Sequence, residues 1–223
     1  MEMRLIFKIL IIFSFALSSD IYQYEIKSFG IKVAKCDIAI RDTIYNNESS
    51  ILLEYTVNTL NIFNRLFPIN NKYTIIINDN NSTTYFKKFT TQPQITNSIE
   101  TKIKDGKVYY SNSNYDIPSN TLNIFSLLYL LMKKPDQINF NDHDILEREG
   151  KKYSYSITNE NTKYILNLFE IDDDEGLIKY TDIFTWAIFK DNVERHIYIK
   201  DKIIDKCVVK SGVLNFSAEY IEK

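Results

Sequence analysis

The 223-residue chain carries 27 lysine and arginine residues against 29 aspartate and glutamate residues, a formal net charge of −2. This balance excludes a dedicated nucleic-acid groove, which needs a concentrated basic surface. With 5 glycines and 4 prolines, the chain also lacks the composition of a flexible linker or a low-complexity tract.

The first residues have the pattern of a secretory signal peptide. Arg4 precedes a mostly apolar run over 5–17 in which Lys8 is the single charged residue, and Ser18 and Ser19 follow. A charged start, a short apolar core and a small-residue exit are typical of such a leader. The apolar core after Lys8 is too short for a bilayer, which needs about 20 apolar residues. An uncleaved anchor is the alternative.

From this leader we expect residues 1–19 to be removed by a cut after Ser18 or Ser19. Residues 20–223 are then expected to form a single β-rich domain, long enough for one sizeable core. The mature protein would be exported, periplasmic or extracellular, soluble, and without a transmembrane segment. Its formal charge would be −3, because the leader carries two basic residues and one acidic residue.

The mature chain opens on the alternation of a half-buried strand. Tyr22, Tyr24 and Ile26 alternate with polar residues, the two-residue period of a sheet with one buried face. Further along the same run the apolar positions change parity. The change predicts a β-bulge near Ala34 and Lys35.

One hexapeptide, Asn-Thr-Leu-Asn-Ile-Phe, stands at 58–63 and again at 120–125. The flanking residues diverge at once, so we interpret both copies as helix starts capped by Asn or Ser rather than as a duplication. The first helix should be short and end at Pro68. The second should run to Met132 before Pro135, and because it is apolar on nearly every face we expect it to be buried.

The remaining patterns predict about a dozen short strands at turn-to-turn spacing. We therefore predict a mainly β fold, a curved antiparallel sheet or incomplete β-barrel with one long buried helix and one short helix. After the opening run and an alternating strand over 51–57, the predicted strands cover 73–77, 84–89, 99–103, 108–111, 138–146, 153–157, 163–171, 182–189, 193–199, 207–210 and 213–220.

Three motifs are spread over most of the mature chain: one near its start, a helix after a proline-containing loop, and one near its end. In chain order they are Tyr24-x-Ile26-x-x-x-Gly30-Ile31-x-Val33, the helix over 121–132, and Trp186-x-x-x-x-Asp191-x-x-x-Arg195-x-Ile197.

Together these motifs resemble a large, uncharacterised bacterial family of exported proteins, a domain of unknown function. Such proteins are similar in outline to the periplasmic lipoprotein carriers, which implies a half-open β-barrel with helices lying in its mouth. This chain departs from the family at Ala34, where glycine is frequent, and at His196, where proline is frequent. The resemblance offers no catalytic residue to carry over.

The residues themselves also give no catalytic or metal site. His143 lies between Asp142 and Asp144, but no further ligand follows at a suitable spacing, so a solvated strand end is the better interpretation. The acidic run at 172–176 lacks the alternation of a calcium loop and is interpreted as a polar turn. Neither a nucleophile elbow nor a phosphate-binding glycine loop is present. We expect a non-enzymatic protein with no catalytic residue, no metal and no cofactor.

Two side-chain pairings remain open. Cys36 and Cys207 could form a disulfide in an oxidising compartment, which would stabilise the fold by about 5 kcal/mol in the chain-entropy model. That pairing requires the first and last strands to be neighbours; otherwise both act as small hydrophobic residues. Asp191 and Arg195 could pair across a tight turn.

Two functions from different classes fit this sequence. The supply of 16 tyrosines and 14 phenylalanines and the apolar helix favour an exported envelope protein that binds a lipid or other apolar small molecule between the curved sheet and the helix. Its ligand would contact Phe125, Tyr129, Met132 and Trp186. The alternative is a structural or assembly module of the bacterial envelope, with a filled core and an envelope protein as partner. A cavity of a few hundred Å³ would favour the binding protein, since ligand sites span about 300–1,000 Å³.

Export gives the first test. N-terminal sequencing of the protein recovered outside the cytoplasm should begin at Ser19 or Asp20, because signal peptidase cuts after small residues. A mature protein that still begins at Met1 would contradict the prediction.

Overall fold

The computed structural model describes residues 19–60, 62–111, 113–118, 121–138, 144–171, 177 and 181–222. The leader over 1–18, His143 and the acidic run at 172–176 lie outside this part of the chain. Fourteen strands form one antiparallel sheet in the order β8-β7-β6-β5-β4-β3-β2-β1-β14-β13-β12-β11-β10-β9. The strands are β1 (Asp20–Ser28), β2 (Ile31–Tyr45), β3 (Glu48–Thr59), β4 (Asn70–Asn78), β5 (Thr83–Gln92), β6 (Ile95–Lys104), β7 (Lys107–Tyr109), β8 (Asn114–Asp116), β9 (Asp144–Arg148), β10 (Lys151–Glu160), β11 (Lys163–Glu170), β12 (Glu194–Lys200), β13 (Ile203–Ser211) and β14 (Leu214–Tyr220).

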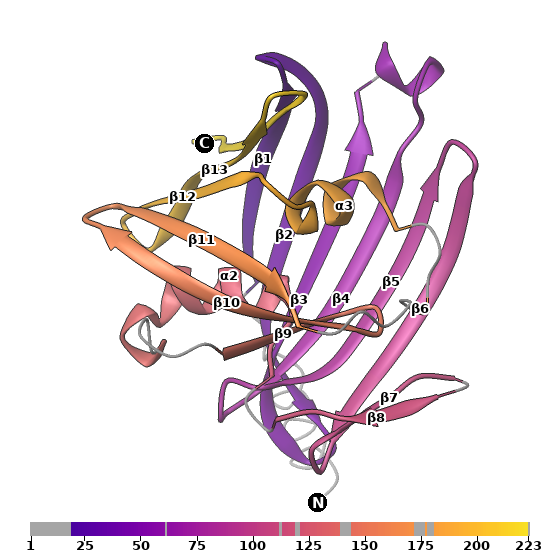
Figure 1. Ribbon diagram of the computed structural model, residues 1–223, viewed down its shortest axis with the longest axis vertical. Coiled ribbons are helices and arrows are strands. Elements are labelled where there is room, and N and C mark those ends of the chain that lie inside the picture. Colours follow the sequence, from indigo (N-terminus) through magenta and orange to yellow (C-terminus); the bar gives the residue numbers. More distant parts are fainter. Residues whose placement is uncertain are drawn as a thin grey trace, which may run out of the picture.

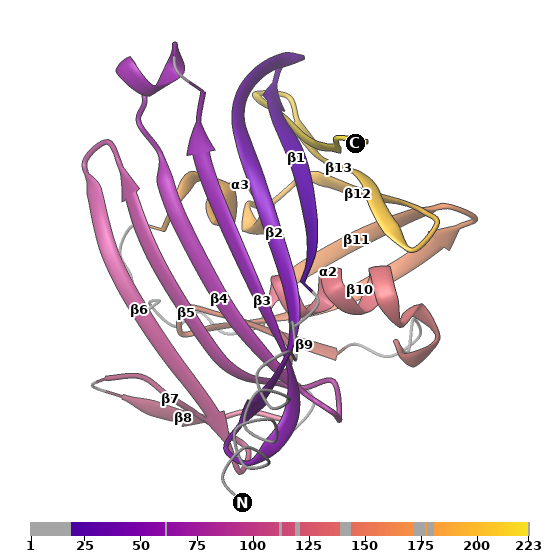
Figure 2. The ribbon, with the colours of Figure 1, turned by 180° about the vertical axis from the view of Figure 1, so that it is seen from behind.

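The sheet curls over itself. Strands β1 to β6 form a tall wall, and the strands from β9 to β12 cross in front of its concave face, with the helices α2 (Ile124–Lys133) and α3 (Ile183–Phe189) on that side (Figures 1 and 2). The first and last strands, β1 and β14, pair through Tyr24 and Tyr220. The prediction of a mainly β protein with a curved antiparallel sheet is confirmed.

The strand alternation at the start of the mature chain is confirmed as well. Tyr22, Tyr24 and Ile26 are buried on the concave side. Ile26 lies opposite Ala34, whereas the next residue of β1 lies opposite Lys32, so one extra residue of β2 bulges between them. The bulge therefore falls beside the predicted position and reverses the inward parity of β2.

The long helix is buried, as its sequence predicts. Asn123 is its N-cap, and the Asn123 side chain accepts a hydrogen bond of 2.8 Å from the amide of Ser126. Leu127 and Leu131 are fully buried, and the helix contacts β4, β9 and β13. A helix apolar on most faces thus fills the space that the curled sheet encloses.

The short helix lies elsewhere than predicted. In the first copy of the hexapeptide, the chain remains in β3 up to Thr59, and the loop that follows holds a 3₁₀ turn, η1 (Phe63–Arg65); a second such turn, η2 (Pro135–Gln137), follows α2. The second α-helix is α3, where we predicted a strand over 182–189. The short apolar run of α3 has no clear period, and such runs are ambiguous between strand and helix.

The ends of α3 explain why this run is helical. The carboxylate of Asp182 accepts hydrogen bonds of 3.0 Å from the amides of Phe184 and Thr185, which caps the first turn. At the other end, Arg195 does not form the expected hairpin ion pair. Its guanidinium donates to the carbonyl oxygens of residues 188, 190 and 193, which helps to end the helix and orient the chain that follows.

The disulfide that the sequence left open is not formed. Cys36 and Cys207 are free thiols, because β1 and β14 both lie between the strands that carry them. Burial raises the pKa of each thiol to about 12. Both cysteines therefore act as small, unreactive hydrophobic residues, the alternative that the sequence left open.

The buried helix gives the second test. Replacing Leu127 with Asp should destabilise the fold by about 4 kcal/mol or more, because an unpaired charge would enter the core. Thermal unfolding followed by circular dichroism measures the effect. The matched control is Leu66→Asp, at an exposed position, which should change the melting temperature little. Equal melting temperatures for the two variants would mean that α2 is not a core element.

Candidate functional site

The structure places Phe125, a predicted ligand contact, inside an aromatic cluster. Its ring centroid lies 4.8 Å from that of Tyr55, 4.7 Å from that of Tyr73 and 6.0 Å from that of Phe86. These partners come from three neighbouring strands, β3, β4 and β5. Such contacts anchor α2 to the sheet.

The other three predicted contacts do not join Phe125 around one cavity. Tyr129 and Met132 are buried in α2. Trp186 belongs to α3 and is 42% exposed, with the Lys190 ammonium 4.7 Å from its ring. Sequence reasoning placed Trp186 on a strand facing α2, and this placement is wrong because residues 183–189 are helical.

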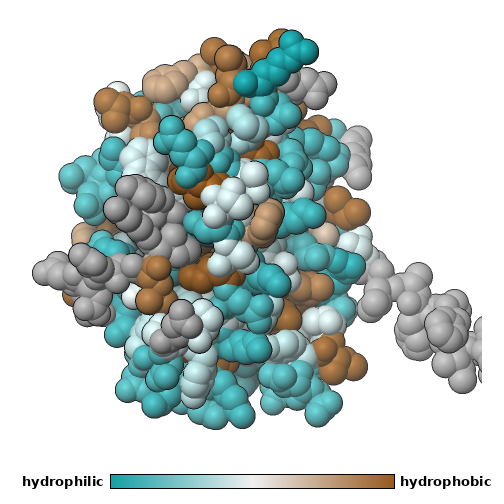
Figure 3. Space-filling view, turned by 90° about the vertical axis from the view of Figure 1, so that its right-hand side faces the viewer, coloured by the Kyte–Doolittle hydropathy of each residue, from teal (hydrophilic) through white to brown (hydrophobic). Residues whose placement is uncertain are grey.

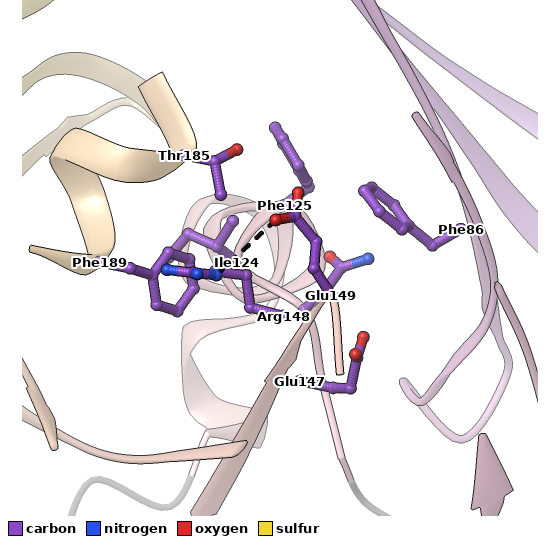
Figure 4. A pocket seen from close by; sticks show the side chains of 9 residues that line it. Phe86, Ile124, Phe125, Glu147, Arg148, Glu149, Thr185 and Phe189 are labelled. Carbon is purple, nitrogen blue, oxygen red and sulfur yellow. Dashed lines mark ion pairs between the residues drawn. The ribbon is translucent and has the colours of Figure 1, made fainter. Parts of the chain in front are cut away.

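The cavity between α2, α3 and β9 is small. Its volume is about 20 Å³, room for about one water molecule and too little for an organic ligand. Figure 4 shows the side chains that surround it. They are Phe86, Asn123, Ile124, Phe125, Glu147, Arg148, Glu149, Thr185 and Phe189. This cavity is therefore no site for the predicted lipid.

Beside this cavity lies a buried ion cluster that the sequence analysis missed. Lys88 of β5 is fully buried and points inward between Phe86 and Thr90. Its ammonium donates to the carboxylate of Glu149, in the turn after β9, and to Asp182 Oδ2 at 3.0 Å. The sequence did contain a signal for this cluster, because Lys88 falls on the inward-facing positions of β5 together with Phe86 and Thr90.

The cluster holds one ammonium and two carboxylates away from water. Burial alone would raise the pKa of Asp182, but the charge of Lys88 and hydrogen bonds from Thr185 hold that pKa below its usual value. Thr181 adds a hydrogen bond of 3.0 Å between its hydroxyl and Glu149. The cluster thereby joins β5 to the start of α3 and to the β9–β10 turn.

A third buried carboxyl group, that of Glu147, forms no ion pair among the described residues and accepts hydrogen bonds from neutral donors. Its Oε1 accepts hydrogen bonds from Tyr110, from Tyr115 at 2.9 Å and from the amide of Gly150 at 3.0 Å. Burial raises its pKa, although these hydrogen bonds oppose the rise. Glu147 ties the β7–β8 region to β9. It is enclosed by protein rather than set in an open cleft, which favours a structural role.

An open apolar groove lies at one end of the molecule, between α3 and the sheet, and we call it the α3 groove. Its volume is about 200 Å³. Most of its lining is apolar. The polar side chains in the lining are the hydroxyls of Ser28 and Thr59, and no charged residue lines the groove. The full lining comprises Ser28, Val33, Ala34, Thr59, Phe63, Phe67, Ile69, Ile183, Phe184 and Phe216.

The ion cluster positions one wall of this groove. Ile183 and Phe184, which line the groove, directly follow Asp182 in the chain. The amide of Ile183 also donates to the side chain of Gln92 at 3.3 Å. Buried polar contacts with β5 therefore determine where the groove-lining face of α3 lies.

Neither a metal site nor a spanning helix is found in the described part of the chain. No group of three or more His, Cys, Asp or Glu side chains gathers there in a way that could hold a metal ion. Among the same residues, no helix has both the length and the apolar character needed to cross a bilayer.

Comparison with known proteins adds a fold relationship. No family model matches the chain, and no curated protein matches it. The structure is similar to the crystal structure of a β-barrel-like protein of domain of unknown function DUF1849 from Brucella abortus, with a TM-score of 0.53 and 8% sequence identity. The match covers 92% of this chain and 96% of that one. At this identity the likeness shows a shared barrel-like fold.

The ion cluster gives the third test. Replacing Lys88 with Met, which has a similar length, should lower the free energy of unfolding by about 3–5 kcal/mol, because buried Asp182 loses its cation and buried Glu149 keeps only Arg148, whose Nε lies 3.9 Å from Glu149 Oε2. Chemical denaturation measures this loss.

Two companion variants separate charge from packing. Lys87→Met, at the exposed neighbouring position of β5, should change stability by about 0.5 kcal/mol or less. Adding Glu149→Gln and Asp182→Asn to Lys88→Met should restore much of the loss, since neutral amides tolerate burial better and Asn still caps α3. If Lys88→Met were as stable as Lys87→Met, the cluster would not hold the fold.

Proposed function

We propose that the protein is an exported, non-enzymatic envelope protein that binds one acyl chain of a lipid in the α3 groove. The observation that carries the proposal is an apolar groove, open to solvent and free of charged lining residues, whereas the cavity between α2, α3 and β9 has a volume of about 20 Å³. Export rests on the leader sequence.

The chemistry of the groove supports an alkyl chain rather than a polar metabolite. Polar ligands need a few placed donors and acceptors for orientation. In the groove, Ser28 and Thr59 provide the side-chain hydroxyls, and the remaining walls are aliphatic and aromatic carbon. Burying apolar surface is favourable without any directional contact.

The size of the groove sets the size of the bound group. A volume of about 200 Å³ is below the 300–1,000 Å³ typical of sites that enclose a drug-sized molecule. The groove would therefore hold part of one chain while the rest of the lipid stays outside. The sequence hypothesis placed the ligand against α2; the proposal moves it to the other helix, because the cavity between α2, α3 and β9 holds only about 20 Å³.

The alternative, a structural or assembly module, also has a specific observation in its favour. The nearly filled space around α2 is what a purely structural core would show. An envelope protein partner would then bind the outer surface. The two functions differ in one property, which is saturable binding of a free fatty acid.

Binding of a fatty acid gives the fourth test. The delipidated protein should bind cis-parinaric acid saturably, with fluorescence of the probe rising as it enters the groove. Val33→Phe should weaken binding by roughly tenfold or more, because the added ring occupies the groove. Val33 is half-buried, so the larger side chain can be accommodated toward the groove.

The matched control is Val208→Phe. Val208 is also half-buried in a strand but does not line the groove, so this variant should bind like the wild type. Absence of saturable binding in the wild type would remove the carrier function and favour the structural module. Equal binding by both variants would place the ligand elsewhere.

A further inference from the structure

Three chain turns at the groove end of the molecule expose large apolar side chains. We call this surface the apolar rim and define it by Phe29, Ile31, Ile62, Leu66 and Val213, whose exposed fractions run from 60% to 78%. They lie in the β1–β2 turn, the loop with η1, and the β13–β14 turn, all at the top of Figures 1 and 2. In Figure 3 the same end carries brown, hydrophobic side chains among teal ones.

Backbone hydrogen bonds hold these turns together. The amide of Phe29 donates to the carbonyl of Asn215 at 2.9 Å, which joins the β1–β2 turn to β14. The amide of Leu60 donates to the carbonyl of Val33 at 3.0 Å, which joins the η1 loop to β2. The rim is therefore one surface rather than three separate tips.

The charge of the three turns is one-sided. The segments 27–32, 59–70 and 209–215 contain no acidic residue, although the chain has 29 in total. They contain Lys27, Lys32, Arg65 and Lys210. Lys27 and Lys32 pair with Glu219 and Glu25 of the adjoining strands, while no ion pair engages Arg65 or Lys210 among the described residues.

We propose that the apolar rim docks on the surface of an anionic lipid bilayer. Apolar side chains flanked by basic ones are the combination that enters the boundary between headgroups and acyl chains of an anionic leaflet. Exposed apolar patches of this kind mark interaction sites on otherwise polar surfaces. A protein partner would need no excess of one charge, whereas an anionic leaflet attracts Arg65 and Lys210, the two cations of the rim that no ion pair engages among the described residues.

This inference rests on the proposed function and deepens it by naming the source of the acyl chain. The η1 loop supplies Ile62 and Leu66 to the rim and Phe63 and Phe67 to the groove wall. The groove therefore opens beside the rim. An acyl chain could pass from the bilayer into the groove without crossing water.

A second hollow at the same end favours a headgroup beside the groove. It has a volume of about 490 Å³, shares Thr59 and Phe63 with the α3 groove, and is lined by Lys32 and Lys35. Each of these ammonium groups also pairs with a carboxylate, Lys32 with Glu25 at 2.7 Å and Lys35 with Asp37 at 3.2 Å, so a headgroup anion would compete with these partly exposed ion pairs. Apolar lining in the groove and ammonium groups in the adjoining hollow match the two ends of an anionic lipid.

The fifth test is co-sedimentation with vesicles. The full chain and its variants are mixed with vesicles of phosphatidylglycerol and phosphatidylcholine in equal parts, and with phosphatidylcholine alone. The wild type should sediment with the anionic vesicles, and salt should weaken this binding. The double variant Ile62→Ser, Leu66→Ser should bind roughly tenfold less, because two exposed apolar anchors are lost. Arg65→Glu should weaken binding to the anionic vesicles.

The matched control uses exposed apolar residues outside the rim. Ile44, 79% exposed at the other end of β2, and Phe169 of β11 are both replaced by Ser. This variant should sediment like the wild type, and all the serine changes lie on the surface, so unfolding does not confuse the comparison. If the control variant lost as much vesicle binding as the rim variant, the rim would not be the docking surface. The same would hold if both variants bound vesicles like the wild type.

Two further outcomes separate the competing explanations. If light scattering showed a wild-type dimer that the rim variant splits, and neither bound vesicles, the rim would be a contact between copies and the proposal would be overturned. Val33→Phe should still sediment with anionic vesicles. Vesicle binding by a wild type that fails to bind cis-parinaric acid would remove the groove function while the docking surface stood.

Discussion

The arrangement of this protein depends on the burial of one ammonium group between two carboxylates. Lys88 projects from β5, the fourth strand from one edge of the sheet, into the space where most β proteins place only apolar side chains. Glu149 and Asp182 meet it from segments far along the chain. Taking these charges from water is costly unless each keeps a partner. The sheet, the β9–β10 turn and α3 are therefore held in one relative position.

That constraint acts together with the packing of α2. The curled sheet encloses α2, the Phe125 ring occupies the space among three strands, and the cavity between α2, α3 and β9 has a volume of only about 20 Å³. Room is left at the end of the sheet, where α3 spans the opening. Asp182 is the N-cap of α3. The same buried carboxylate that pairs with Lys88 therefore also positions Ile183 and Phe184, which line the groove.

The α3 groove and the apolar rim share the η1 loop, so the same end of the molecule carries an apolar groove and an exposed apolar surface. Side chains of the η1 loop point into the groove at Phe63 and Phe67 and toward solvent at Ile62 and Leu66. A surface of this composition would be a liability for a protein that remains alone in water. Contact with a lipid surface would cover the rim and supply the groove in one step.

The sequence by itself determined the features that follow from local periodicity. Alternation at Tyr22, Tyr24 and Ile26 predicted a half-buried strand, and the apolar wrap around Leu127 predicted a buried helix, because burial needs only the right side chains at the right period. The tertiary structure decided whether the run at 183–189 is helix or strand, since both fit so short an apolar segment and the cap at Asp182 selects the helix. It also decided the candidate site. Lys88 lies 61 residues from Glu149 and 94 from Asp182 in the sequence, and the α3 groove joins residues from Ser28 to Phe216. Only the folding of the sheet brings such segments together.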